Sequence, residues 1–214
     1  MERKELSESK LAELREAVRP YLKPKRYLHT LAVEEEAARL GALFLPERVN
    51  ALRASALLHD ITKKDDLEKQ LQYCAEFGII YDIFDRNSPK IFHAKTAAEL
   101  ARRDFSDYVD DEIISGIRWH TTGRAEMTLF ETIVYLADYI EKTRDFEDCV
   151  ELRRFFYDGI SDPAADRREC LVRTMVLSFD MTIRQLLSDG APIDGDTIGA
   201  RNRFLREAAE FEKK

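Results

Sequence analysis

Glycine and proline are scarce in this chain of 214 residues, which contains 8 glycines and 6 prolines. This composition excludes collagen-like repeats and proline-rich linkers, and it argues against a β-protein with many turns. Cysteine is also sparse, since Cys74, Cys149 and Cys170 lie far apart and no two of them have the spacing of a zinc site or a redox motif. We therefore expect free thiols instead of a disulfide framework.

Long apolar runs and an excess of basic charge are absent as well. No apolar stretch reaches the roughly 18 residues that a transmembrane helix needs. Residues 1–18 are charged and amphipathic, without the apolar centre of a secretory signal peptide. The formal net charge of −7 opposes binding to a nucleic-acid backbone. We expect a cytoplasmic protein that binds neither a membrane nor a nucleic-acid polymer.

Helical periodicity dominates the sequence, and no segment shows the period of two that is typical of a strand. Gly78 is expected to end one helix, and Thr128 with Glu131 forms a capping box that predicts a helix start at Leu129. The first helix is marked by Leu11, Leu14, Val18 and Leu22, and the others are expected at about 25–44, 47–61, 64–77, 93–105, 110–120, 129–142, 146–158, 163–188 and 195–211. Residues 79–92 are predicted to form a loop. The fold class is therefore all-α, a globule of about eight to ten helices.

The chain has four histidines, and each stands at or near an expected helix end or break. They are His29, His59, His93 and His120. His59 is followed directly by Asp60, and neighbours on a helix diverge by about 100°, so both side chains can reach one ion only from a helix end. Asp138 lies in an apolar helical segment, where a carboxylate must be paired or coordinated. Imidazole and carboxylate ligands together suit first-row transition metal ions.

Basic side chains accompany these candidate ligands. Arg26 precedes the first histidine by three residues and is expected on the same helix face. Lys63 follows the second histidine by four residues, and Arg144 follows Asp138 by six. A metal ion together with lysine and arginine is the combination that neutralises charge on a transferring phosphoryl group. Each residue alone is more often structural or solvated, so the prediction depends on their joint order along the chain.

This order resembles that of the HD-domain metal-dependent phosphohydrolases, and most closely the YqeK-type family of bacterial symmetrical bis(5′-nucleosyl)-tetraphosphatases. The resemblance covers about residues 15–205 and is carried by the segments RYLHTLAV (26–33), LLHDITK (57–63), WHTTG (119–123), YLADYIEKTR (135–144) and PIDGDTIGARN (192–202). The chain departs from the family pattern at Ala32 and Ala94, where glycine is common, and at Lys142, where proline is common.

The resemblance implies a single HD domain over residues 1–214, with a core at about 20–160 and a C-terminal helical appendage at about 163–212. It implies a first metal ion, typically iron, although the same ligand types accept manganese, cobalt, nickel or zinc. The ligands of this ion would be His29, His59, Asp60 and Asp138. His93 and His120 would bind a second ion or contact phosphate.

The implied reaction is hydrolysis of diadenosine tetraphosphate, or a related dinucleoside polyphosphate, at its central bridge to two nucleoside diphosphates, which are ADP for the diadenosine substrate. Asp60 would orient the nucleophile, Lys63 would stabilise phosphate charge, and His93 or His120 would protonate the leaving diphosphate. The implied substrate contacts are Arg26, His29, Lys63, His93, His120, Asp138 and Arg144. The oligomeric state stays open, and a homodimer is the arrangement that the resemblance favours.

Three alternatives stay open from the sequence. The nearest is an HD-domain phosphohydrolase that acts on another nucleotide, such as a monophosphate, a triphosphate or a guanosine polyphosphate alarmone. A helical histidine and aspartate site also occurs in di-iron oxygenases. A nucleotide sensor without catalytic activity is the third alternative, and the complete ligand set argues against it.

Overall fold

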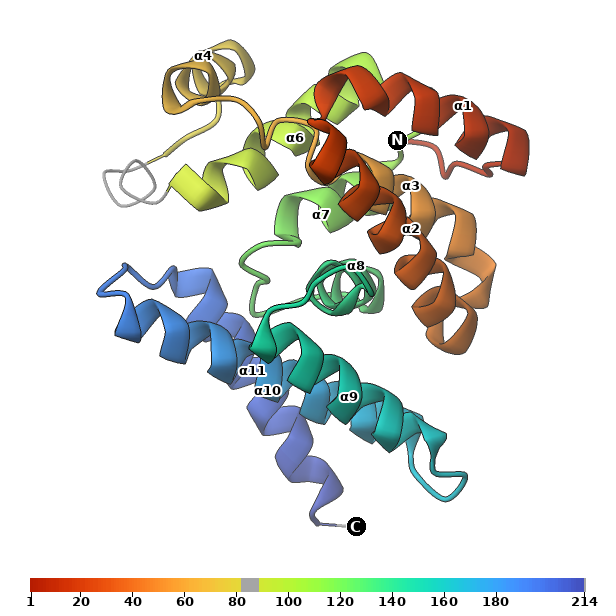
Figure 1. Cartoon of the computed structure of the whole chain (residues 1–214), viewed down its shortest axis with the longest axis vertical. Helices are drawn as coiled ribbons and strands as arrows, with labels where there is room; N and C mark the ends of the chain where they lie inside the picture. The colour runs from red at the N-terminus through yellow and green to blue at the C-terminus, as the bar shows by residue number, and fades with distance from the viewer. Residues whose placement is uncertain (82–88, 214) are drawn as a thin grey trace. The chain divides into compact units, whose positions relative to one another are not determined.

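The computed structural model describes residues 1–81 and 89–213 (Figure 1). Within these ranges there are ten α-helices, two 3-10 segments (Arg19–Tyr21 and Pro46–Arg48) and no strand, which confirms the all-α prediction. The α-helices are α1 Glu8–Val18, α2 Pro24–Phe44, α3 Val49–Leu58, α4 Leu67–Phe77, α6 Pro89–Asp104, α7 Asp111–Trp119, α8 Leu129–Ile140, α9 Glu147–Ser161, α10 Arg167–Ser188 and α11 Gly195–Phe211. None of the helices in the described ranges combines the length and apolar character that crossing a bilayer requires.

Local sequence signals set several helix ends. The predicted capping box is present at the start of α8, where the Thr128 hydroxyl accepts a hydrogen bond from the Glu131 N–H and the Glu131 carboxylate accepts one from the Thr128 N–H. Gly78 ends α4 as predicted, with a φ of 65° that only glycine adopts without strain. These ends were predictable because each depends on contacts within a few residues.

Other boundaries differ from the prediction. α3 ends at Leu58 instead of about 61, and the residues after it form turns. α4 begins at Leu67 instead of about 64, because the Asp66 carboxylate caps it by accepting the Lys69 N–H. α10 likewise begins at Arg167 instead of about 163, after the capping residue Asp166.

The loop predicted over residues 79–92 was wrong at its C-terminal end, where the structure has a helix. α6 begins at Pro89. Proline is favoured in the first turn of a helix, because its fixed φ is already helical and the N–H that it lacks has no partner there. Residues 82–88 of the predicted loop lie outside the described residues.

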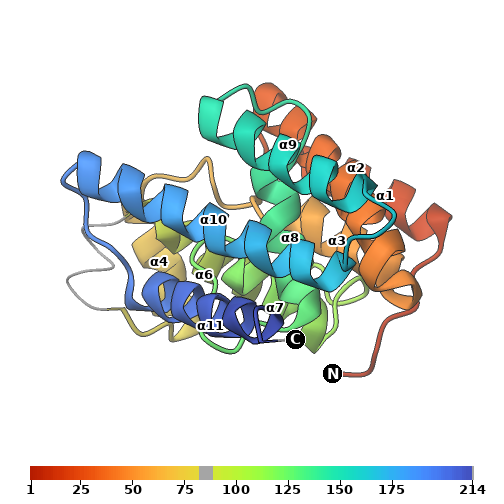
Figure 2. The ribbon, with the colours of Figure 1, turned by 90° about the horizontal axis from the view of Figure 1, so that it is seen from below.

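The chain divides into two compact units, and each is described by itself. The first comprises residues 1–121 and 128–143, and the second comprises residues 122–127 and 144–214. In the first unit α2 packs against α3 and α8, and α7 packs against α3, α6 and α8; Figure 1 shows α8 nearly end-on beside these helices. In the second unit α10 lies between α9 and α11 (Figure 2).

α7 approaches its neighbours very closely at Gly116. A Cβ atom there would meet the Ser55 hydroxyl oxygen of α3 at 2.6 Å and the Phe130 ring of α8 at 2.8 Å. We expect Gly116→Ala to lower the free energy of unfolding by about 1–3 kcal/mol, because a close-packed core does not accommodate an added methyl group. Denaturant unfolding measures this change. Gly195→Ala is the matched control, since nothing lies within 4 Å of its Cβ position; equal losses in both variants would refute the packing argument.

Candidate active site

The His–Asp pair lies at the end of α3, as the divergence of neighbouring side chains requires. His59 is the residue that caps the helix, Asp60 follows in a turn, and both are buried. His59 Nδ1 lies 2.6 Å from the carbonyl oxygen of Ala56. A carbonyl oxygen only accepts hydrogen bonds, so Nδ1 carries the proton and Nε2 keeps its lone pair.

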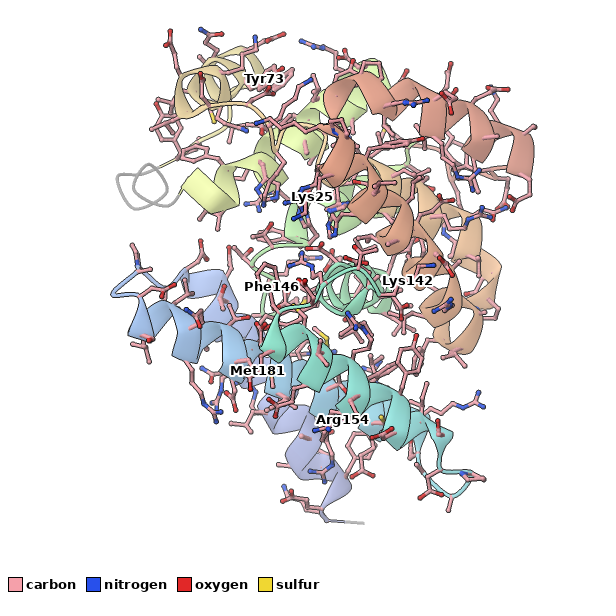
Figure 3. The ribbon with its side chains drawn as sticks, in the orientation of Figure 1. Lys25, Tyr73, Lys142, Phe146, Arg154 and Met181 are labelled. Atoms are coloured by element: carbon pink, nitrogen blue, oxygen red, sulfur yellow. The ribbon has the colours of Figure 1, made fainter. Side chains whose placement is uncertain are left out.

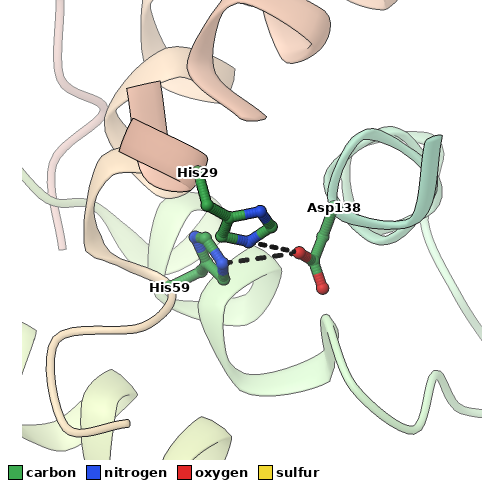
Figure 4. Close-up of side chains that lie close together, drawn as sticks. All are labelled: His29, His59 and Asp138. Atoms are coloured by element: carbon green, nitrogen blue, oxygen red, sulfur yellow. Dashed lines mark ion pairs between the residues drawn. The ribbon is translucent and has the colours of Figure 1, made fainter. Parts of the chain in front are cut away.

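α2 and α8 bring two further candidate ligands to the same point (Figure 4). His29 Nε2 lies 3.0 Å from Asp138 Oδ1, and His59 Nε2 lies 3.6 Å from that same oxygen. The ligand atoms of these three residues all lie within 4.8 Å of one another. Asp138 stands in the last turn of α8. Side chains from three helices thus form one group that could hold a metal ion.

A second group gathers around Asp60. The ligand atoms of His59, Asp60 and His120 lie within 4.8 Å of one another, so both groups share His59. Asp60 Oδ1 lies 3.1 Å from His93 Nε2 and 3.7 Å from His120 Nε2. His120 Nδ1 donates to the carbonyl oxygen of Ile117 at 2.7 Å, which repeats the arrangement of His59. The structure therefore brings all six predicted ligand residues into one cluster.

Burial and charge set the protonation of this cluster. Burial alone would raise the pKa of Asp60, but the neighbouring histidines, His59 first, hold it well below its usual range. Burial, followed by the charge of Lys63, lowers the pKa of His93 to about 3. Burial also lowers the pKa of His120. The ionised carboxylate of Asp60 beside the neutral imidazoles of His93 and His120 offers ligand atoms in the protonation state that metal binding requires.

The donor set fits a divalent transition metal ion. His59 Nε2 is buried and makes no hydrogen bond to any described residue, although carboxylate oxygens of Asp60 and Asp138 lie 3.2 and 3.6 Å away. A lone pair that faces two carboxylates is costly to bury unless a cation lies between them. Nitrogen and oxygen ligands without a thiolate accept iron, manganese, cobalt, nickel and zinc.

Two of the predicted cationic residues lie at the edge of the cluster. Arg26 Nη1 is 3.0 Å from Asp60 Oδ2, and the Arg26 side chain keeps 36% of its surface exposed. Lys63 Nζ is 3.0 Å from His93 Nε2. Arg144 belongs to the second unit, so its contact with a substrate stays a prediction.

Comparison with known proteins assigns the family. The family model of the HD domain matches residues 26–143 of the sequence. This range contains every candidate metal ligand described above. The chain belongs to the HD-domain family. The resemblance found in the sequence is thereby confirmed.

The relatives of this HD-domain protein include two that are named symmetrical bis(5′-nucleosyl)-tetraphosphatase. The one from Halalkalibacterium halodurans is 31% identical over 89% of this chain and 94% of the relative. The one from Bacillus subtilis is 34% identical over 85% of this chain and 90% of the relative. A crystal structure described as a predicted HD superfamily hydrolase involved in NAD metabolism, from Clostridium acetobutylicum, has a TM-score of 0.80 and 30% identity over 92% of this chain and 97% of its own.

Sequence reasoning missed one charged residue of this HD domain, Glu141. Its side chain is fully buried, and its Oε1 lies 2.9 Å from His29 Nδ1. Burial alone would raise the pKa of Glu141, but hydrogen bonds from His29 and Thr143 outweigh burial and lower it. Its position was a usable signal, because a residue three places after Asp138 lies on the same side of α8.

A buried polar network that was also not predicted holds the turn after the His–Asp pair. The Thr62 hydroxyl donates to the His93 carbonyl oxygen at 3.0 Å, and the Gln70 amide donates to the Thr62 carbonyl oxygen at 2.6 Å. Thr96 of α6 donates to the Gln70 side-chain oxygen. These bonds tie the turn that carries Asp60 to the helix that carries His93.

Loss of the shared ligand should disable both metal groups. We expect His59→Ala to lower the affinity for a divalent ion by about 100-fold or more, since loss of an outer-shell partner alone typically costs about 10- to 100-fold. Calorimetric titration with Mn²⁺ measures the affinity, and circular dichroism checks that the helices persist. Glu68→Gln, which removes an exposed carboxylate from α4, is the control and should bind like the parent. Parent-like affinity in His59→Ala would rule out His59 as a ligand.

Proposed function

We propose that this protein is a metal-dependent hydrolase that cleaves diadenosine tetraphosphate and related dinucleoside polyphosphates symmetrically to two nucleoside diphosphates. The observation that carries the proposal is the convergence of imidazole and carboxylate ligands from α2, α3 and α8 beside two cationic side chains. The names of the relatives, which match this chain over most of their length, support this substrate class over another nucleotide.

The metal ligands in this proposal are His29, His59, Asp60 and Asp138, and His120 with Asp60 would hold any second ion. When bound, a divalent ion activates water at neutral pH and neutralises charge on the phosphoryl oxygens. Iron is the ion that we would test first, and manganese, cobalt, nickel and zinc share the same donor preference.

Asp60 would orient the attacking water, because its two oxygens face different partners. Oδ2 lies near His59 and Arg26, and Oδ1 lies near His93. Arg26, beside this carboxylate, and Lys63, beside His93, would bind phosphate oxygens. A positioned cation of this kind stabilises the charge that builds up on the phosphoryl group in the transition state.

Geometry favours His93 over His120 as the group that protonates the leaving diphosphate. The two Nε2 atoms lie 3.0 Å apart, and His120 already carries its proton on Nδ1. Lys63 Nζ lies 3.0 Å from Nε2 and 3.2 Å from Nδ1 of His93, so the Lys63 ammonium can replace the proton that neutral His93 gives to the leaving diphosphate. His93 also belongs to neither metal group found among the described residues, which supports a role in proton transfer.

A product assay tests the proposed reaction. The protein is purified without oxygen, loaded with ferrous ion and given diadenosine tetraphosphate, and the nucleotides are separated by ion-exchange chromatography. We expect ADP as the sole product. AMP together with ATP would mean that the cut falls at another phosphorus and would refute symmetrical cleavage. The His59→Ala variant controls for contaminating hydrolases.

Residues proposed to bind phosphate should differ from the proposed metal ligands in the kinetic effect of their substitution. Lys63→Gln is expected to lower kcat by about 100- to 1000-fold, the usual effect of removing a group that stabilises transition-state charge, with metal content unchanged. Arg144→Gln is expected to lower kcat/KM in the same way. Lys64→Gln is the control. Lys64 is next to Lys63 in the sequence, but its ammonium is exposed and donates to the Pro20 carbonyl oxygen. Metal loss in Lys63→Gln would show that Lys63 maintains the metal site and does not act on phosphate.

A further inference from the structure

The imidazole of His29 is held from two sides by one helix. Asp138 Oδ1 lies 3.0 Å from Nε2, and Glu141 Oε1 lies 2.9 Å from Nδ1. Both carboxylates come from the C-terminal end of α8, where Glu141 caps the helix one turn after Asp138. Glu141 therefore lies behind the ring, on the side opposite to the candidate metal position.

Glu141 is itself held in place. The Thr143 hydroxyl donates to its Oε1 at 2.7 Å, and the Thr143 N–H donates to its Oε2. The next side chain, Lys142, is labelled in Figure 3. It forms an ion pair with Glu35 of α2 and so joins the same turn to the helix of His29. The carboxylate has a fixed position from which to accept the His29 Nδ1 proton.

The other two histidines of the metal groups are oriented differently. His59 and His120 donate their Nδ1 protons to main-chain carbonyl oxygens three residues before them, those of Ala56 and Ile117. Their ring orientation thus depends on the end of their own helix. His29 depends on a side chain 112 residues away, and that side chain carries a full negative charge.

We infer that Glu141 is the positioning residue for His29. By accepting the Nδ1 proton it fixes the tautomer in which the Nε2 lone pair faces Asp138, and its charge makes the imidazole a stronger ligand for a divalent ion. It touches neither the ion nor the substrate. The inference rests on the metal-binding part of the proposed function and on none of its substrate chemistry.

Mn²⁺ affinity in the absence of substrate tests the inference. We expect Glu141→Gln, which keeps the shape of the side chain but loses its charge, to bind Mn²⁺ about 10-fold more weakly than the parent. Glu141→Ala, which removes the acceptor, should bind about 100-fold more weakly. The matched control is Glu131→Gln, because Glu131 is also fully buried on α8 but its carboxylate caps the helix start. This control is expected to lose stability and to keep parent affinity.

A direct readout of the tautomer separates positioning from general damage to the fold. Long-range ¹H–¹⁵N spectra of metal-free protein with labelled histidine resolve the ring nitrogens, and with only four histidines the His29→Gln variant assigns the signals. We expect His29 to be protonated on Nδ1 in the parent and in Glu131→Gln, and to shift toward the Nε2 form in Glu141→Ala. A His29 Nδ1 without a proton in the parent, or parent affinity in both Glu141 variants, would overturn the inference. A parent protein that binds no divalent ion would instead overturn the proposed function.

Discussion

Imidazoles and carboxylates must be buried together at the meeting point of α2, α3, α7 and α8, and the first unit is organised around this requirement. An ionised carboxylate that leaves water without compensation costs several kcal/mol. The structure compensates Asp60 with nearby histidines and with Arg26. His29, His59 and His120 direct their Nδ1 protons outward to acceptors, which leaves their Nε2 atoms toward the carboxylates.

Helix ends make this arrangement geometrically possible. α3 stops at Leu58 and α7 stops at Trp119, so that His59, Asp60 and His120 leave their helices and reach a common point. A longer α3 would have sent two adjacent side chains in different directions. The network through Thr62 then fastens this turn to α6 and to the backbone of His93.

Local charge at the site differs from the charge of the whole molecule. The chain carries a formal charge of −7, yet Arg26 lies beside the buried carboxylate of Asp60 and Lys63 lies beside His93. A negative protein can therefore present a cationic edge to a polyphosphate. Net charge excludes broad classes of partner, but a phosphate site depends on a few side chains within several ångströms of it.

The sequence by itself determined the fold class, most helix positions, the capping box of α8 and the residue types of the site, because these follow from interactions between residues a few places apart. Only the tertiary structure decided that one oxygen of Asp138 faces two histidines, that His93 lies within reach of both Asp60 and Lys63, and that Glu141 stands behind His29. Those contacts join distant parts of the chain, and helix packing, which no short segment encodes, sets their distances.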